Sequence, residues 1–116
     1  MSNEKICQKF LRAAASTLRK AGLARGTRRE PYTGHMCMLG AMDNCGIHIK
    51  FDERKHVERH VASLLRLPSQ GIYDTYNNGR VTSSSPPSLQ IACWNNMVAF
   101  DTEEVAAKLD LAAESC

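Results

Sequence analysis

The segment GHMCMLGAMDNCG, residues 34–46, decides the fold. Glycines flank it, and an internal glycine, Gly40, leaves room for the close approach of another backbone. On a helical projection one face carries small or sulfur-bearing side chains: Cys37, Met38, Ala41, Met42 and Cys45. A helix that is apolar on most sides belongs in the interior of a protein. We therefore predict a short helix over residues 35–45, buried at the centre and wrapped by longer helices.

Three further segments have the periodicity of amphipathic helices around this central one. Residues 3–21, 52–67 and 102–114 repeat apolar side chains every three or four positions. Capping chemistry marks their ends. The expected caps and stops are Ser2 or Asn3 and Gly22 for the first, Asp52 and Pro68 for the second, and the Asp101–Glu104 pair for the third.

The remaining segments are less regular. Residues 88–97 favour a helix that begins near Pro87 over a buried strand, because proline is well suited to a first helical position. Residues 24–33 and 69–87 are rich in loop-forming residues, and the second stretch has a β-turn signal at Asn78-Gly79. The prediction is a mostly α protein: one domain over residues 1–116, a compact bundle of four to five short helices, and one long loop with a small β-turn.

Cysteine number, hydrophobic segments and net charge indicate where the protein is expected to be located and what it is expected to bind. Five cysteines, an odd number at irregular spacings, favour reduced thiols over a disulfide framework. Residues 1–16 are amphipathic, unlike a signal peptide, and no stretch approaches the ~20 apolar residues that span a bilayer. We expect a cytoplasmic protein that does not bind membranes. The net charge of +3 is mild for a nucleic-acid-binding protein.

Short motifs are spread over most of the chain. They are G-x-x-C-x-x-G-A at residues 34–41, W-N-N at 94–96 and T-x-E-V at 102–105. This pattern resembles an uncharacterised family of small proteins from actinobacteria and their phages, whose members tend to have aspartate where this chain has Asn96. The resemblance implies a small helical fold and a bacterial or phage setting, in which the cytoplasm would be that of the host. It carries over no catalytic residue.

Cys37 is the candidate nucleophile. It is expected near a helix N-terminus, where the helix dipole lowers a thiol pKa, and His35 is two residues away. Catalysis also needs a base beside the sulfur and donors for an oxyanion. Because Cys37 shares its helical face with Ala41 and Cys45, we favour a core role for it over catalysis.

His56 and His60 are the candidate metal ligands. They stand four residues apart on a predicted helix, a spacing at which two imidazoles can bind one metal ion. A third ligand such as His48, Cys37 or Cys45 would be needed, and the HExxH glutamate is missing. We therefore favour two semi-exposed histidines, and we predict no cofactor.

Two further groups are candidate binding residues. Trp94, Asn95 and Asn96 are expected to anchor the core and cap the following turn, with ligand binding as the alternative. The arginines of residues 24–33 can grip phosphates or an acidic partner, although an ordinary solvated loop is the interpretation that we favour. These arginines are Arg25, Arg28 and Arg29.

Three functions compete. The first is a small non-enzymatic protein that binds a macromolecule, most naturally a protein, and could be a phage-encoded modulator of a host target. The second is a cysteine-dependent hydrolase or transferase that uses Cys37 with a histidine base. The third is a weak nucleic-acid binder that uses the loop arginines. The sequence leaves the oligomeric state open.

Overall fold

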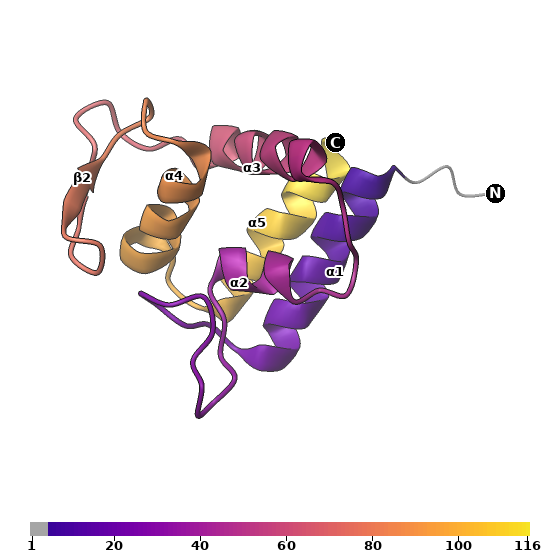
Figure 1. Ribbon diagram of the computed structural model, residues 1–116. Coiled ribbons are helices and arrows are strands. Elements are labelled where there is room, and N and C mark those ends of the chain that lie inside the picture. The colour runs from indigo at the N-terminus through magenta and orange to yellow at the C-terminus, as the bar shows by residue number, and fades with distance from the viewer. Residues whose placement is uncertain (1–4) are drawn as a thin grey trace.

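The computed structural model describes residues 5–116, and most of them are helical (Figure 1). The elements in chain order are α1 (Ile6–Ala21), α2 (Met38–Asp43), α3 (Phe51–Leu65), β1 (Ile72–Asp74), β2 (Gly79–Val81), α4 (Pro87–Cys93), the π-helix η1 (Trp94–Val98) and α5 (Thr102–Glu114). The predicted mostly α fold is confirmed. None of the helices in residues 5–116 is long and apolar enough to cross a membrane.

The short central helix α2 is buried, as predicted. The four hydrophobic side chains within residues 38–42 are each at most 5% exposed. The helix α2 packs against both α1 and α4 (Figure 1). The helix is shorter than the predicted 35–45, because the backbone before it pairs with the loop that follows α1. The Met36 N–H donates to the Gly22 carbonyl, and the Met36 carbonyl accepts from the Ala24 N–H, both at 2.8 Å.

The close approach predicted at Gly40 is also present. A Cβ at this position would lie 1.7 Å from the Arg28 carbonyl oxygen, so the loop over α2 requires a residue with no side chain. The central helix and the loop 24–29 are therefore packed backbone against backbone.

Helices α1 and α5 lie side by side and share an apolar interface (Figure 1). Small side chains, which let two helices pack closely, make up much of it. The buried alanines of the two helices are Ala14, Ala15, Ala106, Ala112 and Ala113. On the outside, the Arg19 guanidinium bonds to both Glu103 and Asp110, with each shortest distance 2.7 Å.

A disulfide between Cys7 and Cys116 joins the same two helices at their other end. The prediction that all cysteines are reduced is therefore wrong for this pair. Cysteines 109 positions apart in sequence become neighbours because α1 and α5 run alongside each other, which irregular spacing could not show. Cys37, Cys45 and Cys93 are free thiols.

The helix ends differ from the predictions in some places. The proposed capping residues Ser2 and Asn3 lie outside the described residues, and the Lys5 N–H at the start of α1 donates to Gln8 Oε1 at 3.1 Å. Lys50 rather than Asp52 is the N-cap of α3, and Asp52 lies in the first turn, where the helix dipole favours a carboxylate. Helix α4 begins at Pro87 as predicted. Helix α5 also begins as predicted, with Asp101 Oδ1 accepting from the Glu104 N–H at 2.9 Å.

The long loop of residues 69–87 contains a small β-hairpin. Strands β1 and β2 pair antiparallel, with Ile72 opposite Val81 and Asp74 opposite Gly79. Asn78, predicted to lie in a turn, has a φ of 55°, the left-handed conformation that asparagine tolerates. The predicted helix over 88–97 is divided between α4 and the wider turns of η1.

Candidate functional site

Three segments that are far apart in sequence meet at one corner of the molecule: the loop 24–29, the hairpin β1–β2 and the π-helix η1. Figure 1 shows the loop after α1 reaching the lower end of α4, close to the lower turn of the hairpin. We call this region the corner. Most of the polar candidates from the sequence lie in it, so its geometry determines what they can do.

Asn95 joins the central helix to the loop from a fully buried position. Its Oδ1 accepts from the Met38 N–H at 3.0 Å, and its Nδ2 donates to the Ala24 carbonyl at 2.9 Å. The Met38 N–H is one of the α2 donors that have no partner inside the helix. The predicted capping of the following turn is therefore wrong for this side chain, which instead satisfies backbone groups 57 and 71 positions away.

Asn96 links the loop to the hairpin. Its Oδ1 accepts from the Gly26 N–H at 2.8 Å, and its Nδ2 donates to Asp74 Oδ2 at 3.2 Å. A carboxylate at this position could accept from Gly26 but would face the Asp74 carboxylate without a proton to donate. The amide at Asn96 thus fits a buried acid as its neighbour.

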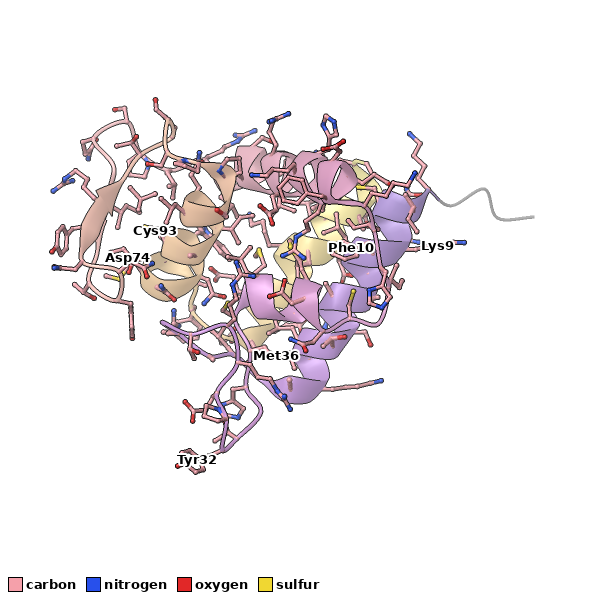
Figure 2. All side chains as sticks on the ribbon, viewed as in Figure 1. Lys9, Phe10, Tyr32, Met36, Asp74 and Cys93 are labelled. Atoms are coloured by element: carbon pink, nitrogen blue, oxygen red, sulfur yellow. A yellow bond between two sulfur atoms is a disulfide. The ribbon has the colours of Figure 1, made fainter. Side chains whose placement is uncertain are left out.

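Asp74 is a fully buried carboxylate that the sequence interpretation missed. It accepts from the backbone N–H groups of Tyr76 and Asn77 at 3.0 and 3.3 Å, and from Asn77 Nδ2 at 2.9 Å. Figure 2 shows Asp74 close to Cys93 of α4. Burial, and secondly the charge of Asp74, raise the pKa of the Cys93 thiol, which keeps it protonated.

The Arg25 side chain binds four backbone carbonyls in and just after η1. Its Nη1 donates to the carbonyls of Asn95 and Asn96 at 2.6 and 3.2 Å, and its Nη2 donates to those of Ala99 and Phe100 at 2.7 and 3.2 Å. The last carbonyls of a helix have no partner inside it, and Arg25 supplies one. Its guanidinium therefore holds the end of η1.

The other two loop arginines have different surroundings. Arg28 pairs with Asp43 at the end of α2, at 2.6 Å, and is 56% exposed. The Arg29 backbone forms a bridge with Met36, while its side chain is exposed. The predicted arginine group is thus divided among an inner contact, a surface ion pair and an exposed side chain.

A cavity of about 210 Å³ opens at the corner. It is lined by Gly26, Thr27, Arg28, Cys37, Leu39, Asn77, Ser88, Leu89, Ala92 and Asn96. Cys37 is the N-cap of α2: it is 5% exposed, and its Sγ accepts from the Gly40 N–H at 3.4 Å. His35 is not part of the lining, and its ring packs instead against Gly22. Cys37 and His35, the two candidate catalytic residues, thus do not line the same cavity.

The candidate metal ligands lie elsewhere. His56 and His60 line a cavity of about 310 Å³ beside the disulfide, and His60 Nε2 is 2.9 Å from the Ala112 carbonyl oxygen. No group of three or more His, Cys, Asp or Glu side chains within residues 5–116 is arranged to hold a metal ion.

Trp94 is buried, with Lys108 Nζ 5.6 Å from its ring centroid, and it anchors η1 in the core as predicted. Around it, the outer side of the corner exposes large apolar side chains, which the sequence interpretation missed. We call this set the corner surface: Tyr76, Leu89, Met97, Val98 and Phe100. Two contacts join the hairpin to η1 and to the loop, since Thr75 Oγ1 donates to Met97 Sδ at 3.6 Å and the Tyr76 ring packs on Gly26.

Comparison with known protein families gives a match over most of the chain. The family DUF6197, described as a family of unknown function, matches residues 4–115. No curated protein and no solved structure matches the chain.

Proposed function

We propose that this chain, which belongs to the family of unknown function DUF6197, is a non-enzymatic interaction protein that binds a protein partner on its corner surface. The observation that carries this proposal is a group of exposed apolar side chains on a rigid polar base. Phe100 is 81% exposed and Tyr76 is 52% exposed, although both belong to segments with well-bonded backbones. Exposed apolar patches of this kind are typical of protein-binding sites.

The composition of the corner surface favours a protein as the ligand. Aromatic residues and methionine are enriched in protein–protein interfaces, and Phe100, Tyr76 and Met97 supply them here. Methionine adapts its shape to a partner, whereas the aromatic rings lose little entropy when they are buried.

The hydrogen bonds beneath the corner surface would keep that surface in one arrangement. Asn96 and Arg25 join η1 to the loop and the hairpin, so a partner would meet segments already held together. Pre-organisation of this kind reduces the entropy lost on binding. A π-helix also costs stability and occurs frequently at functional sites, which supports a role for η1 beyond packing.

We also propose the setting in which this binding takes place: the cytoplasm, as a modulator of a host protein if the chain is encoded by a phage. The motif resemblance supports this part of the proposal, whereas the Cys7–Cys116 disulfide counts against it, because disulfides are rare in the reducing cytoplasm.

The enzymatic alternative needs a reactive Cys37. A thiol-specific probe at neutral pH tests it, with Cys45 as the internal comparison because that thiol is partly exposed. We expect Cys37 to react more slowly than Cys45 in the folded protein and equally fast after unfolding. Faster labelling of Cys37 in the folded protein would support catalysis.

The nucleic-acid alternative relies on the loop arginines, of which Arg25 and Arg28 already have partners. Binding through them would weaken steeply with salt. We expect no salt-dependent binding of RNA or DNA at micromolar protein concentration.

Photo-crosslinking from two matched positions tests the protein-binding proposal. A photoreactive phenylalanine analogue replaces Phe100 in the corner surface or Phe51 on α3, an aromatic side chain that is 73% exposed away from the corner. We expect position 100, and not position 51, to crosslink one protein in the lysate of the host cell.

That protein is then purified and its affinity measured directly. We expect Phe100→Ser to weaken binding at least tenfold and Phe51→Ser to leave it unchanged. Equal crosslinking at both positions, or equal affinity of both variants, would contradict the proposal.

A further inference from the structure

A third cavity, away from the corner, lies between the end of α3 and the start of α4. These two helix ends are neighbours in Figure 1. The volume of the cavity is about 240 Å³, smaller than most drug-sized ligand pockets. It is lined by Arg59, Ala62, Ser63, Arg66, Leu67, Ser83, Pro87 and Gln90. The lining thus has two guanidinium groups, hydroxyls and an amide, and it has no carboxylate.

The two arginines of this cavity are unusual among those of residues 5–116. Most of the others bond to carboxylates or carbonyl oxygens: Arg19, Arg25, Arg28, Arg54 and Arg80. In the described part of the chain, the Arg59 and Arg66 side chains make no such bond and are exposed. Arg59 lies within α3 and Arg66 is its C-cap, and both line the cavity. Both guanidiniums are free to bind a ligand at the cavity.

Arg66 occupies a conformation that costs energy. It is the C-cap of α3 with a φ of 51°, in the left-handed region that a long side chain rarely adopts. This turn directs the chain away from the helix axis immediately after Leu65. Such backbone is commonly found near functional sites, and here it belongs to one of the two free arginines.

The opposite wall of the cavity is held in place by hydrogen bonds. Gln90, which is buried, donates through Nε2 to the carbonyls of Ser83 and Ser85 at 3.0 and 2.7 Å. Ser85 Oγ accepts from the Thr82 N–H at 3.0 Å. The Ser83 hydroxyl therefore stands on a fixed turn and makes no bond of its own within residues 5–116.

From these observations we infer that the α3–α4 cavity binds a phosphate monoester group carried by a small molecule. Guanidinium forks match the geometry of phosphate oxygens, and two of them balance a dianion. A hydroxyl donor at Ser83 completes the set of groups that bind phosphate. The cavity volume fits a phosphate with a small substituent.

Backbone amide spectra of the whole protein, recorded during titration at constant ionic strength, test this inference. The probes are inorganic phosphate, O-phosphoserine and dimethyl phosphate, with sodium chloride as the blank. We expect phosphate and O-phosphoserine to shift the amides of residues 59–67 and 83–90. Dimethyl phosphate, a monoanionic diester like those of nucleic acids, should bind at least tenfold more weakly.

Variants identify the site. We expect Arg59→Gln and Arg66→Gln each to weaken phosphate binding about fivefold, and the double variant beyond tenfold. The control is Arg29→Gln, which removes an exposed arginine from the other end of the molecule and should leave the affinity unchanged. If Arg66→Gln unfolds the chain, Arg59→Gln still tests the site because it lies in regular helix.

Absence of shifts with every phosphate probe would overturn the inference, as would shifts centred on Arg29 or equal binding of the diester. Because Arg59, Arg66 and Ser83 lie outside the corner surface, failure of either proposal leaves the other intact.

Discussion

The α1–α5 pair and the corner are held together in different ways. The helix pair is joined by apolar packing of alanines and leucines, with a disulfide at one end and an ion pair on the outside. The corner is joined by side-chain amides, a buried carboxylate and an arginine that bond to backbone groups of distant segments. Apolar packing tolerates small adjustments, whereas each bond in the corner fixes one geometry.

Loss of the disulfide should have the largest effect on stability, and it concerns the helix pair. We expect the double variant Cys7→Ser/Cys116→Ser to lower the free energy of unfolding by about 4 kcal/mol, because the bond constrains a long loop in the unfolded chain. Urea unfolding with and without a dithiol reductant measures the same loss in the wild type. Cys45→Ser is the control, and reduction should still destabilise it.

Under native conditions, reduction of the disulfide should shift the amide signals of the helix pair and leave those of the corner unchanged. If reduction shifted the amide signals of the corner as strongly as those of α1 and α5, the two regions would not be independent.

Asn95→Ala should have the next largest effect, within the corner. The substitution leaves the Met38 N–H and the Ala24 carbonyl buried without a partner, and each such group costs roughly 1–3 kcal/mol. We expect a loss of about 3 kcal/mol in urea unfolding. Asn44→Ala, which removes one bond from an exposed asparagine to the Gly40 carbonyl, should cost less than ~1 kcal/mol. Equal losses would mean that the corner does not depend on its buried amide.

Gly40→Ala tests the backbone contact under the corner. Alanine normally favours a helix over glycine by about 1 kcal/mol. Here the new Cβ would meet the Arg28 carbonyl, and overpacking costs roughly 1–3 kcal/mol. We expect a net loss of up to about 2 kcal/mol by thermal or urea unfolding. Gly79→Ala, where nothing lies within 4 Å of the new Cβ, should be close to neutral, and a stabilising Gly40→Ala would contradict the packing described.

The smallest effect concerns the ion pair on the outside of the helix pair. The Arg19 hydrogen bond lowers the pKa of Glu103 below its unfolded value. Its contribution to stability is therefore present above the unfolded pKa of about 4.3 and is lost as the pH falls through the folded value. We expect Glu103→Gln to be slightly less stable than the wild type at pH 7 and equally stable near pH 2. Glu114→Gln is the control, and a deficit that persists at low pH would exclude the ion pair as its cause.

The two regions also differ in how far they could be predicted. The helix pair follows from the repeat of apolar residues in α1 and α5, and the buried α2 follows from a segment that is apolar on most sides. The disulfide did not follow, because it depends on the relative position of two helix ends. The corner could be predicted only in part: W-N-N was singled out as structural, but the partners of Asn95 lie 57 and 71 positions away.

Asp74 shows why the rest could not be predicted. A single aspartate before the residues of a turn gives the pattern of an exposed loop. The bond to Asn96, 22 positions away, ties this carboxylate to the core and could not be seen in the sequence. The exposure of Tyr76, Met97 and Phe100 could not be predicted either, because an exposed apolar residue outside a regular amphipathic helix belongs to no periodic pattern.

Amide hydrogen exchange at Gly26 tests most directly whether side-chain amides hold the corner together. Gly26 is exposed, so its N–H is protected only if it stays bonded to Asn96 Oδ1. Gly46, another exposed glycine, serves as the comparison. We expect Gly26 to exchange at least a hundredfold more slowly than Gly46 in the wild type, and equally fast in Asn96→Ala. Equal exchange of the two glycines in the wild-type protein would contradict the rigid corner.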